Sequence, residues 1–563
     1  MSPAFVPKEL DLADWVRVRP LYEDLLERPL DSPAAFRRWL ADWSALDDAL
    51  SEESGRRLIR SRQDRTDAHA EEAYMAFVSG TGAKSSEYDF RLKKRLLASP
   101  RVRSLGPDWR PFLAGLRAEV RAFRPENVPL GVQETRLVNA YEAAIGRMSA
   151  RVRGKSLTLA QAGVLLAGRD AALREEAWRA IEARRLKDAA RIDRLMDRLV
   201  RLRSKMARNA GLGAAGYARL NALARRKLDY GPRDSERFAA AVEKLFVPEM
   251  RRIQEERRRA LGTPRLNPWD LSAPLPGAPE LKPYRREKDL VAGVSRIFKR
   301  LDKALSAQFE SIRRAQGLDL ASRPGKGPGG FHYYLPVSKT SFIFMNGAGL
   351  HRDLITLLHE SGHAFHSLSN RGKELSFTRL PGIEFREVAS MSMELLGSRY
   401  LDEFYSPADA RRARREHLEK IVGLFPWVAA VDRFQHWLYA HPRHTARARA
   451  AAWESLMSRF GGREDWSDLP RARGRSWQRQ QHPFSFPFYY LEYGIAQIGA
   501  LQVWRDSRRG YARALRAYRR ALSLGGSRPL SALLRAAGGR FGMDEGALRP
   551  LLAEIKAELR ALS

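Results

Sequence analysis

LLHESGHAFH, residues 357–366, sets two histidines four residues apart and a glutamate directly after the first. Apolar residues recur at helical spacing through this stretch and just before it, which predicts an amphipathic helix. Asp353 lies near the expected helix start, where a negative charge suits the helix dipole. His359, Glu360 and His363 should therefore share one or two turns of a single helix.

Two imidazoles at this spacing can reach one ion, and Zn²⁺ is the usual metal for two nitrogens and a carboxylate with one position left for water. Glu360 would lie beside that water and could act as general base when the water attacks a carbonyl. The alternative is a surface helix with two ordinary histidines. Gly362 argues against this alternative, because a mid-helix glycine costs about 1 kcal/mol relative to alanine and usually marks a close approach by another segment.

A third ligand is expected from the helix that Pro381 and Gly382 open. Glu384, Glu387 and Glu394 can all lie near one face of that helix, and their spacing alone does not select among them. At least one carboxylate should lie near the ion, because two histidines alone leave a catalytic zinc site incomplete. A remaining carboxylate could orient a ligand histidine.

Two short β-like runs, residues 332–337 and 341–346, lie just before the predicted metal helix. The glycine-rich residues 323–330 before them predict a flexible turn. A strand with a free edge at this place could bind an extended peptide through its main chain. A buried hairpin is the equal alternative.

Composition excludes several kinds of site. The 563 residues include no cysteine, so disulfides, thiolate ligands and a thiol nucleophile are ruled out. The net charge of +34 suggests a nucleic-acid or anionic-surface binding protein. The basic residues are scattered, however, and no nucleic-acid-binding motif accompanies them, so nucleic acid is disfavoured as a partner. We expect a cytoplasmic protein, since the N-terminus lacks signal-peptide features and no long apolar run predicts a membrane span.

Pro- and Gly-rich residues 262–285 interrupt an otherwise helical pattern. We therefore predict an N-terminal helical lobe (1–261), an irregular connector (262–285) and a catalytic lobe (286–563). The basic residues 183–208 are interpreted as a solvated helix face with an apolar stripe, and 471–479 as a basic connector.

Residues 481–497 hold a further set of polar and aromatic side chains. Tyr490 and Tyr493 share a face if a helix begins near Phe488. Their hydroxyl groups, with the imidazole of His482, are donors suited to an oxyanion. Taken singly, these aromatic residues would be expected in the core.

The combined motifs resemble those of the oligoendopeptidase F type of zinc peptidase, in the thimet-oligopeptidase-like group. Residues 359–366 are similar to the family core His-Glu-x-Gly-His-Ala-x-His, residues 385–390 to the segment with the third zinc ligand, and residues 482–499 to the segment lining the active site. Weaker similarity extends over nearly the whole chain.

The resemblance implies a mainly α-helical, two-lobed protein with a deep central channel and a small β-sheet near the metal site. It implies one Zn²⁺ per chain, held by His359, His363 and Glu387. His366 and Glu394 would support these ligands from behind, Glu360 would be the base, and His482 with Tyr490 or Tyr493 would stabilise the oxyanion.

The expected activity is cleavage of internal bonds in short, unstructured oligopeptides. A zinc exopeptidase, and a nucleic-acid or anionic-surface binding protein on a peptidase scaffold, are the alternatives. Oligomeric state is left open.

Overall fold

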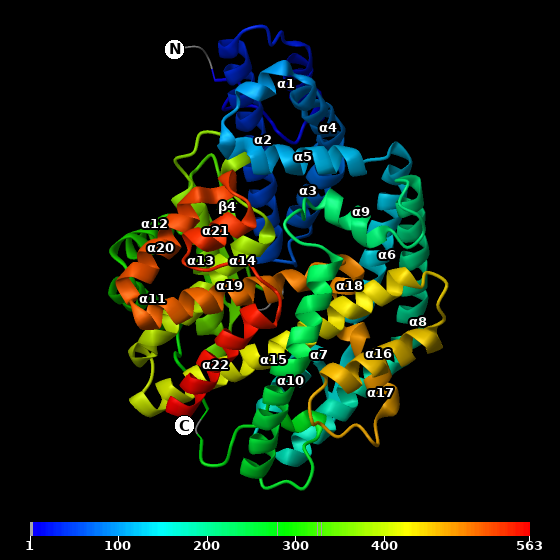
Figure 1. Cartoon of the computed structure of the whole chain (residues 1–563), viewed down its shortest axis with the longest axis vertical. Helices are drawn as coiled ribbons and strands as arrows, with labels where there is room; N and C mark the ends of the chain where they lie inside the picture. Colours follow the sequence, from blue (N-terminus) through cyan, green and yellow to red (C-terminus); the bar gives the residue numbers. More distant parts are fainter. Residues whose placement is uncertain (1–3, 279, 324, 328, 563) are drawn as a thin grey trace. The chain divides into compact units, whose positions relative to one another are not determined.

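The computed structural model describes residues 4–278, 280–323, 325–327 and 329–562, and these are mainly helical with two small sheets (Figure 1). This confirms the expected fold class. The chain separates into two compact units, the first comprising Met1–Arg121, Leu281–Arg414 and Ala496–Phe541, and the second Ala122–Glu280, Arg415–Ile495 and Gly542–Ser563. The contiguous lobes 1–261 and 286–563 stay a prediction about organisation along the chain.

The first unit contains the sheet β3, β4 and β5 and most of the helices near it. Its helices are α1 (Trp15–Glu27), α2 (Pro33–Gln63), α3 (Ala68–Phe77), α4 (Ala83–Ala98), α5 (Arg110–Ala122), α11 (Glu287–Leu301), α12 (Lys303–Arg314), α13 (His351–Ser369), α14 (Ile383–Gly397), α20 (Tyr511–Leu524) and α21 (Leu530–Ala536). α2 starts as its sequence indicates, because the Ser32 hydroxyl accepts a hydrogen bond from the main chain of Ala35 at 3.0 Å. Trp39 and Trp43 of this helix are buried against α1, α4 and α5.

The sheet of this unit has the order β3–β5–β4. The two predicted β runs correspond to β4 (Phe331–Leu335) and β5 (Thr340–Gly347), which pair as an antiparallel hairpin with His332 opposite Ile343. β3 (Leu318–Ala321) pairs in parallel with β5 and was not predicted. β5 is thus the central strand, and β4 lies at an edge.

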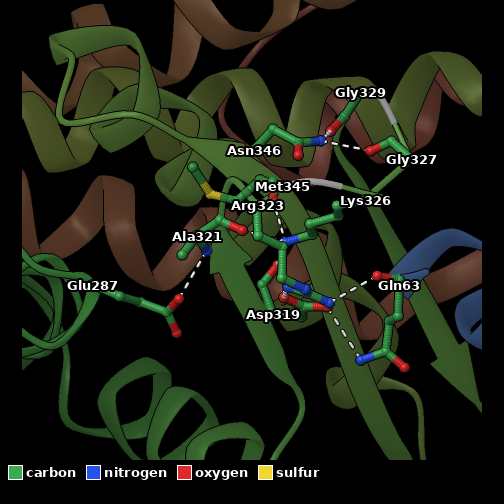
Figure 2. Close-up of polar contacts among 10 residues, drawn as sticks. All are labelled: Gln63, Glu287, Asp319, Ala321, Arg323, Lys326, Gly327, Gly329, Met345 and Asn346. Carbon is green, nitrogen blue, oxygen red and sulfur yellow. Dashed lines mark hydrogen bonds and ion pairs between the residues drawn. The ribbon is translucent and has the colours of Figure 1, made fainter. Parts of the chain in front are cut away.

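Lys326 fastens the loop between β3 and β4 (Figure 2). Its buried ammonium group lies 2.7–3.0 Å from four oxygens, one on the Asp319 carboxylate and three on carbonyls of β3 and β5. Arg323 pairs with both oxygens of the same carboxylate, at 2.6 and 2.9 Å. Asn346 donates to the carbonyls of two loop glycines. The described part of the turn expected to be flexible is therefore held at several points.

The second unit is helical apart from the hairpin β1 (Ser149–Val152) and β2 (Lys155–Thr158). Its helices are α6 (Val128–Gly146), α7 (Leu159–Val164), α8 (Ala171–Asn209), α9 (Tyr217–Ala224), α10 (Pro232–Ala260), α16 (Ala446–Phe460), α17 (Pro470–Arg475), α18 (His482–Ser485) and α22 (Glu545–Ala561). α15 (Pro407–Ala440) and α19 (Tyr490–Arg509) have residues in both units. The predicted apolar stripe of α8 is buried, with Ile192 and Leu199 at most 1% exposed.

Among the described residues, no helix combines the length and the apolar composition needed to cross a membrane.

Candidate functional site

Three predicted ligands converge in the first unit. His359 and His363 lie one turn apart on α13, and Glu387 faces them from α14. One carboxylate oxygen of Glu387 lies 3.5 Å from Nε2 of His359 and 3.7 Å from Nε2 of His363. All three donor atoms lie within 4.8 Å of one another, close enough to ligate a single ion.

Close packing of α13 on α14 creates this convergence; the two helices lie side by side (Figure 1). A Cβ atom placed on Gly362 would lie 2.6 Å from Cα of Ser390 and 2.7 Å from the carbonyl oxygen of Ala389. The close approach predicted for Gly362 is thus confirmed. The same carbonyl accepts a hydrogen bond from the hydroxyl of Tyr518 at 2.8 Å, which ties α14 to α20.

Glu394 orients the first histidine. Nδ1 of His359 donates to a carboxylate oxygen of Glu394 at 2.6 Å, which leaves Nε2 directed toward Glu387. Burial lowers the pKa of His359, but the hydrogen bond and charge of Glu394 outweigh it and raise the pKa to about 9. Metal binding at Nε2 would therefore release a proton.

Glu360 is 7% exposed and lies beside the ligands. Burial raises its pKa to about 7, against the opposing charge of His359 and a hydrogen bond from the main chain of His332 on β4. A carboxyl group that titrates near neutral pH can both accept and return a proton under working conditions. This is the property needed in a general base that later serves as acid.

His366 lies one turn after His363 on α13, and its ring packs edge-on against Phe385 of α14 with the ring centroids 5.7 Å apart. The side chain is 1% exposed, and burial lowers its pKa to about 3. Neither ring nitrogen has a hydrogen-bond partner among the described residues. Its contacts are those of a neutral residue packed between α13 and α14.

His332 on β4 contributes a residue that the sequence did not single out for the site. Its ring stacks on that of His363 at 6.3 Å, and Nε2 lies 2.9 Å from the hydroxyl of Ser341. The edge strand is therefore in contact with the metal helix. Only the clustering of histidines in this region hinted at it.

The second unit brings His482, Tyr490 and Tyr493 together. The ring centroid of His482 lies 4.8 Å from that of Tyr490 and 5.7 Å from that of Tyr493. Tyr489 also joins the group, 5.7 Å from His482. These four rings, which we call the aromatic cluster, lie on α18, on α19 and just before α19.

Gln480 determines which ring nitrogen of His482 carries the proton. The amide oxygen of Gln480 accepts from the indole N–H of Trp427 at 2.9 Å, so its amide nitrogen is the group that donates to Nδ1 of His482 at 2.6 Å. Burial lowers the pKa of His482 to about 4, so the ring is neutral with its proton on Nε2. Burial also raises the pKa of Tyr490 to about 12, which keeps that hydroxyl protonated. Both groups can donate hydrogen bonds.

Two buried cations hold the backbone of this segment. The fully buried guanidinium of Arg203 donates to the carbonyls of Pro483, at 2.8 Å, and Phe484. Lys227 donates to the carbonyl of Phe488 at 2.9 Å and pairs with the buried Glu492. No local pattern in the sequence indicates these long-range contacts.

Phe488 itself has a left-handed backbone conformation (φ 59°), which is strained for a bulky residue. The side-chain oxygen of Gln435 accepts from its main-chain N–H at 2.7 Å, and Lys227 binds its carbonyl. This turn sets the direction in which α19 begins.

Comparison with known proteins agrees with the sequence resemblance. The sequence model of peptidase family M3 matches residues 164–551. A solved structure assigned as an oligoendopeptidase F has 25% identity and a TM-score of 0.91, covering 100% of this chain and 99% of its own. PZ peptidase A with an inhibitor has 24% identity and a TM-score of 0.91, covering 99% of both chains. A structure assigned as an oligoendopeptidase F from Bacillus anthracis strain Ames has 23% identity and a TM-score of 0.86, covering 98% of this chain and 97% of its own. No curated protein sequence matches the chain.

Proposed function

The chain belongs to peptidase family M3, a family of metallopeptidases, and we propose that it is a zinc-dependent endopeptidase that cleaves internal bonds of short, unstructured oligopeptides. The observation that carries this proposal is the convergence of His359, His363 and Glu387 beside Glu360.

The donor set fits one Zn²⁺ per chain. Two imidazole nitrogens and one carboxylate oxygen are ligands that zinc prefers in catalytic sites, and the chain has no cysteine to complete a closed structural site. When bound, Zn²⁺ would act as a Lewis acid and would lower the pKa of a bound water toward neutral pH. Glu394 would hold the His359 ring so that Nε2 faces the ion.

Glu360 would take a proton from the attacking water and return it to the leaving amine. His482, through Nε2–H, and Tyr490 or Tyr493, through the hydroxyl, would donate hydrogen bonds to the oxyanion that forms at the peptide carbonyl. Gln480, Arg203 and Lys227 would keep these donors in position.

The edge strand β4 supports an extended peptide as the substrate. It lies at the edge of its sheet, and its residue His332 contacts both Glu360 and His363. A peptide that paired with β4 through its main chain would bind without a requirement for particular side chains.

The first test is cleavage of an internally quenched peptide that is blocked at both termini, so that an exopeptidase cannot act on it. We expect internal cleavage that a chelator abolishes and added zinc restores. The Glu360→Gln variant should bind zinc stoichiometrically and lose nearly all turnover, whereas Glu374→Gln, at an exposed position of the same unit, should match the wild type. Near wild-type cleavage by Glu360→Gln would disprove the mechanism. Absence of cleavage with zinc bound would favour an exopeptidase or a binding protein.

A further inference from the structure

Arg386 on α14 is a cation beside the metal ligands that the proposed mechanism does not use. It directly precedes the expected ligand Glu387 and follows Phe385, whose ring packs against α13. Ser390 lies four residues further along the same helix and so shares a face with Arg386. The Cα of Ser390 is the atom closest to the Cβ position of Gly362 on α13. The side chain of Arg386 therefore leaves α14 on the face turned toward the metal helix.

The guanidinium group of Arg386 has no counter-ion. Among the residues that the structure describes it forms no ion pair, and its Nε is buried without a hydrogen-bond partner. The residue is only partly buried, so its two terminal nitrogens reach solvent. By contrast, Arg379 in the loop before α14 pairs with both oxygens of Asp48, at 2.6 and 2.7 Å. A buried N–H is costly when it is unpaired, so a ligand or water is expected to accept from Arg386.

The charge of Arg386 reaches both the edge strand and the metal helix. Burial, followed by the charge of Arg386, lowers the pKa of His332 on β4 to about 3. Burial also lowers the pKa of His363, and Arg386 is one of the neighbouring groups that add to this effect. The two histidine rings stack with their centroids 6.3 Å apart. Arg386 thus lies near the place where β4 passes the predicted metal ligands, within the first unit.

We propose that Arg386 is a specificity-determining residue that binds a carboxylate group of the peptide substrate. Its paired N–H donors match the two oxygens of a carboxylate. A peptide that pairs with β4 would pass His332, which contacts His363, so a carboxylate near the cleaved bond would come within reach of this guanidinium. The inference rests on the proposed function, since the peptide must carry the carboxylate, either on an Asp or Glu side chain or at its C-terminus.

The alternative role for Arg386 is to balance the negative charges of Glu360 and Glu387. The two roles predict different results. Charge balance would act on zinc binding and on the cleavage of every peptide alike, because both glutamates serve every turnover. A carboxylate subsite would act selectively, on peptides that carry the carboxylate at the matching position.

Quenched peptides with one core sequence test the subsite and identify the source of the carboxylate. The reference peptide is neutral and amidated, a second set replaces Gln by Glu at successive positions on either side of the cleaved bond, and a third peptide has a free C-terminal carboxylate. For the wild type we expect kcat/KM of at least one acidic peptide to exceed that of the reference about tenfold, mainly through KM. Mass spectrometry of the products then gives the position of the favoured carboxylate relative to the cleaved bond.

Substitutions of Arg386 test whether this residue causes the preference. Arg386→Met keeps an apolar stem but removes the charge, so it should reduce the ratio of acidic to neutral kcat/KM toward one. Arg386→Lys should retain part of the ratio, since an ammonium group attracts a carboxylate without the paired donors. Arg516→Gln removes the same charge from an exposed position on α20 of the same unit and should leave the ratio unchanged. Thermal melts and the zinc content of each purified variant report on the fold and on the metal site.

Several outcomes would overturn the carboxylate subsite. Equal kcat/KM for all peptides in the wild type would do so while leaving the peptidase proposal intact. A preference that persists in Arg386→Met would do so as well, and so would a loss of zinc or a fall in kcat of the same size for every peptide. If Arg386→Met does not fold, Arg386→Lys decides, and an undiminished preference there would overturn the subsite. If the wild type cleaves no peptide at all, including the neutral reference, both proposals fail together.

Discussion

Gly362 on α13 lies so close to Ser390 on α14 that a Cβ atom on the glycine would lie 2.6 Å from Cα of the serine. The contact is with backbone, which cannot move aside as a side-chain tip can. In Gly362→Ala the two helices must separate, so the gain in helix propensity, about 1 kcal/mol, is lost to overpacking of about 1–3 kcal/mol. We expect a lower Tm and weaker zinc binding, measured by thermal melts and by competition with a chromophoric chelator.

Gly423→Ala is the matched control, since Gly423 is also mid-helix but a Cβ there would meet nothing within 4 Å. It should be neutral or stabilising. If both variants behave alike, the approach of α13 to α14 does not determine the metal site.

Glu394 is the second point at which the zinc site can be tested. Glu394→Gln keeps the size of the side chain but removes the negative charge of the group that accepts the hydrogen bond from Nδ1 of His359. Loss of such a partner typically lowers metal affinity 10- to 100-fold, and we expect a loss of about this size. Glu374→Gln serves as the control. Unchanged zinc affinity in Glu394→Gln would mean that packing alone orients the His359 ring.

Substitutions of Glu387 and Glu384 test which of these two glutamates is the third zinc ligand. Glu387 faces both histidines, whereas the carboxylate of Glu384 folds back over Gly382 at the start of α14, where it suits the helix dipole. Glu387→Gln should lose zinc on dialysis, and Glu384→Gln should retain it, as measured by metal analysis of the purified variants. The opposite pattern would show that Glu384 is the ligand.

The parts of the fold and site that sequence could predict are those with local causes. The i, i+4 histidines and the glycine at position 362 each follow from a few neighbouring residues, and the structure places them as expected. β3 was missed because a four-residue strand is defined by its partner β5, which lies more than twenty residues further along the chain.

The buried cations were missed for a related reason. Within the basic stretch 183–208 the apolar stripe was identified correctly, but Arg203 is fully buried rather than solvated. Its partners Pro483 and Phe484 lie far away in sequence, so no periodicity marks it. The composition includes the charge of Arg203 in the total but does not show that the side chain is buried.

Asp319 gives a pH-dependent prediction (Figure 2). Burial opposes its ionisation, but hydrogen bonds from Arg323, Lys326 and Gln63 outweigh burial and lower its pKa to about 2. Because the folded pKa lies below the unfolded value of about 3.9, ionised Asp319 stabilises the fold above pH 4, and this contribution is lost as the pH falls toward 2.

Asp319→Asn should therefore lower the free energy of unfolding by about 2 kcal/mol at pH 7. The difference in Tm between this variant and the wild type should be constant from pH 8 to 5 and should become smaller below pH 4. Asp402→Asn, which removes a carboxylate 50% exposed in a surface pair, should cost under about 1 kcal/mol. A Tm difference for Asp319→Asn that does not narrow in acid would exclude the ion pairs as its origin.

Lys227 and Glu492 test whether the turn before α19 serves catalysis as well as folding. Lys227→Met leaves Glu492 buried without its cation, which typically costs 3–5 kcal/mol, so we expect a large loss in Tm. The double variant Lys227→Met/Glu492→Leu removes both charges and should recover most of that stability. Lys205→Met, at an exposed position on α8, is the control.

The catalytic readout separates the two roles of Lys227. The double variant still lacks the donor to the Phe488 carbonyl, which helps to hold the left-handed turn from which Tyr490 and Tyr493 project. If these tyrosines stabilise the oxyanion, kcat should remain well below the wild type while KM changes little, because a donor displaced by about 1 Å loses transition-state stabilisation. Full recovery of kcat together with Tm would instead show that Lys227 acts only on stability, and that the strained turn needs no anchor to place the aromatic cluster.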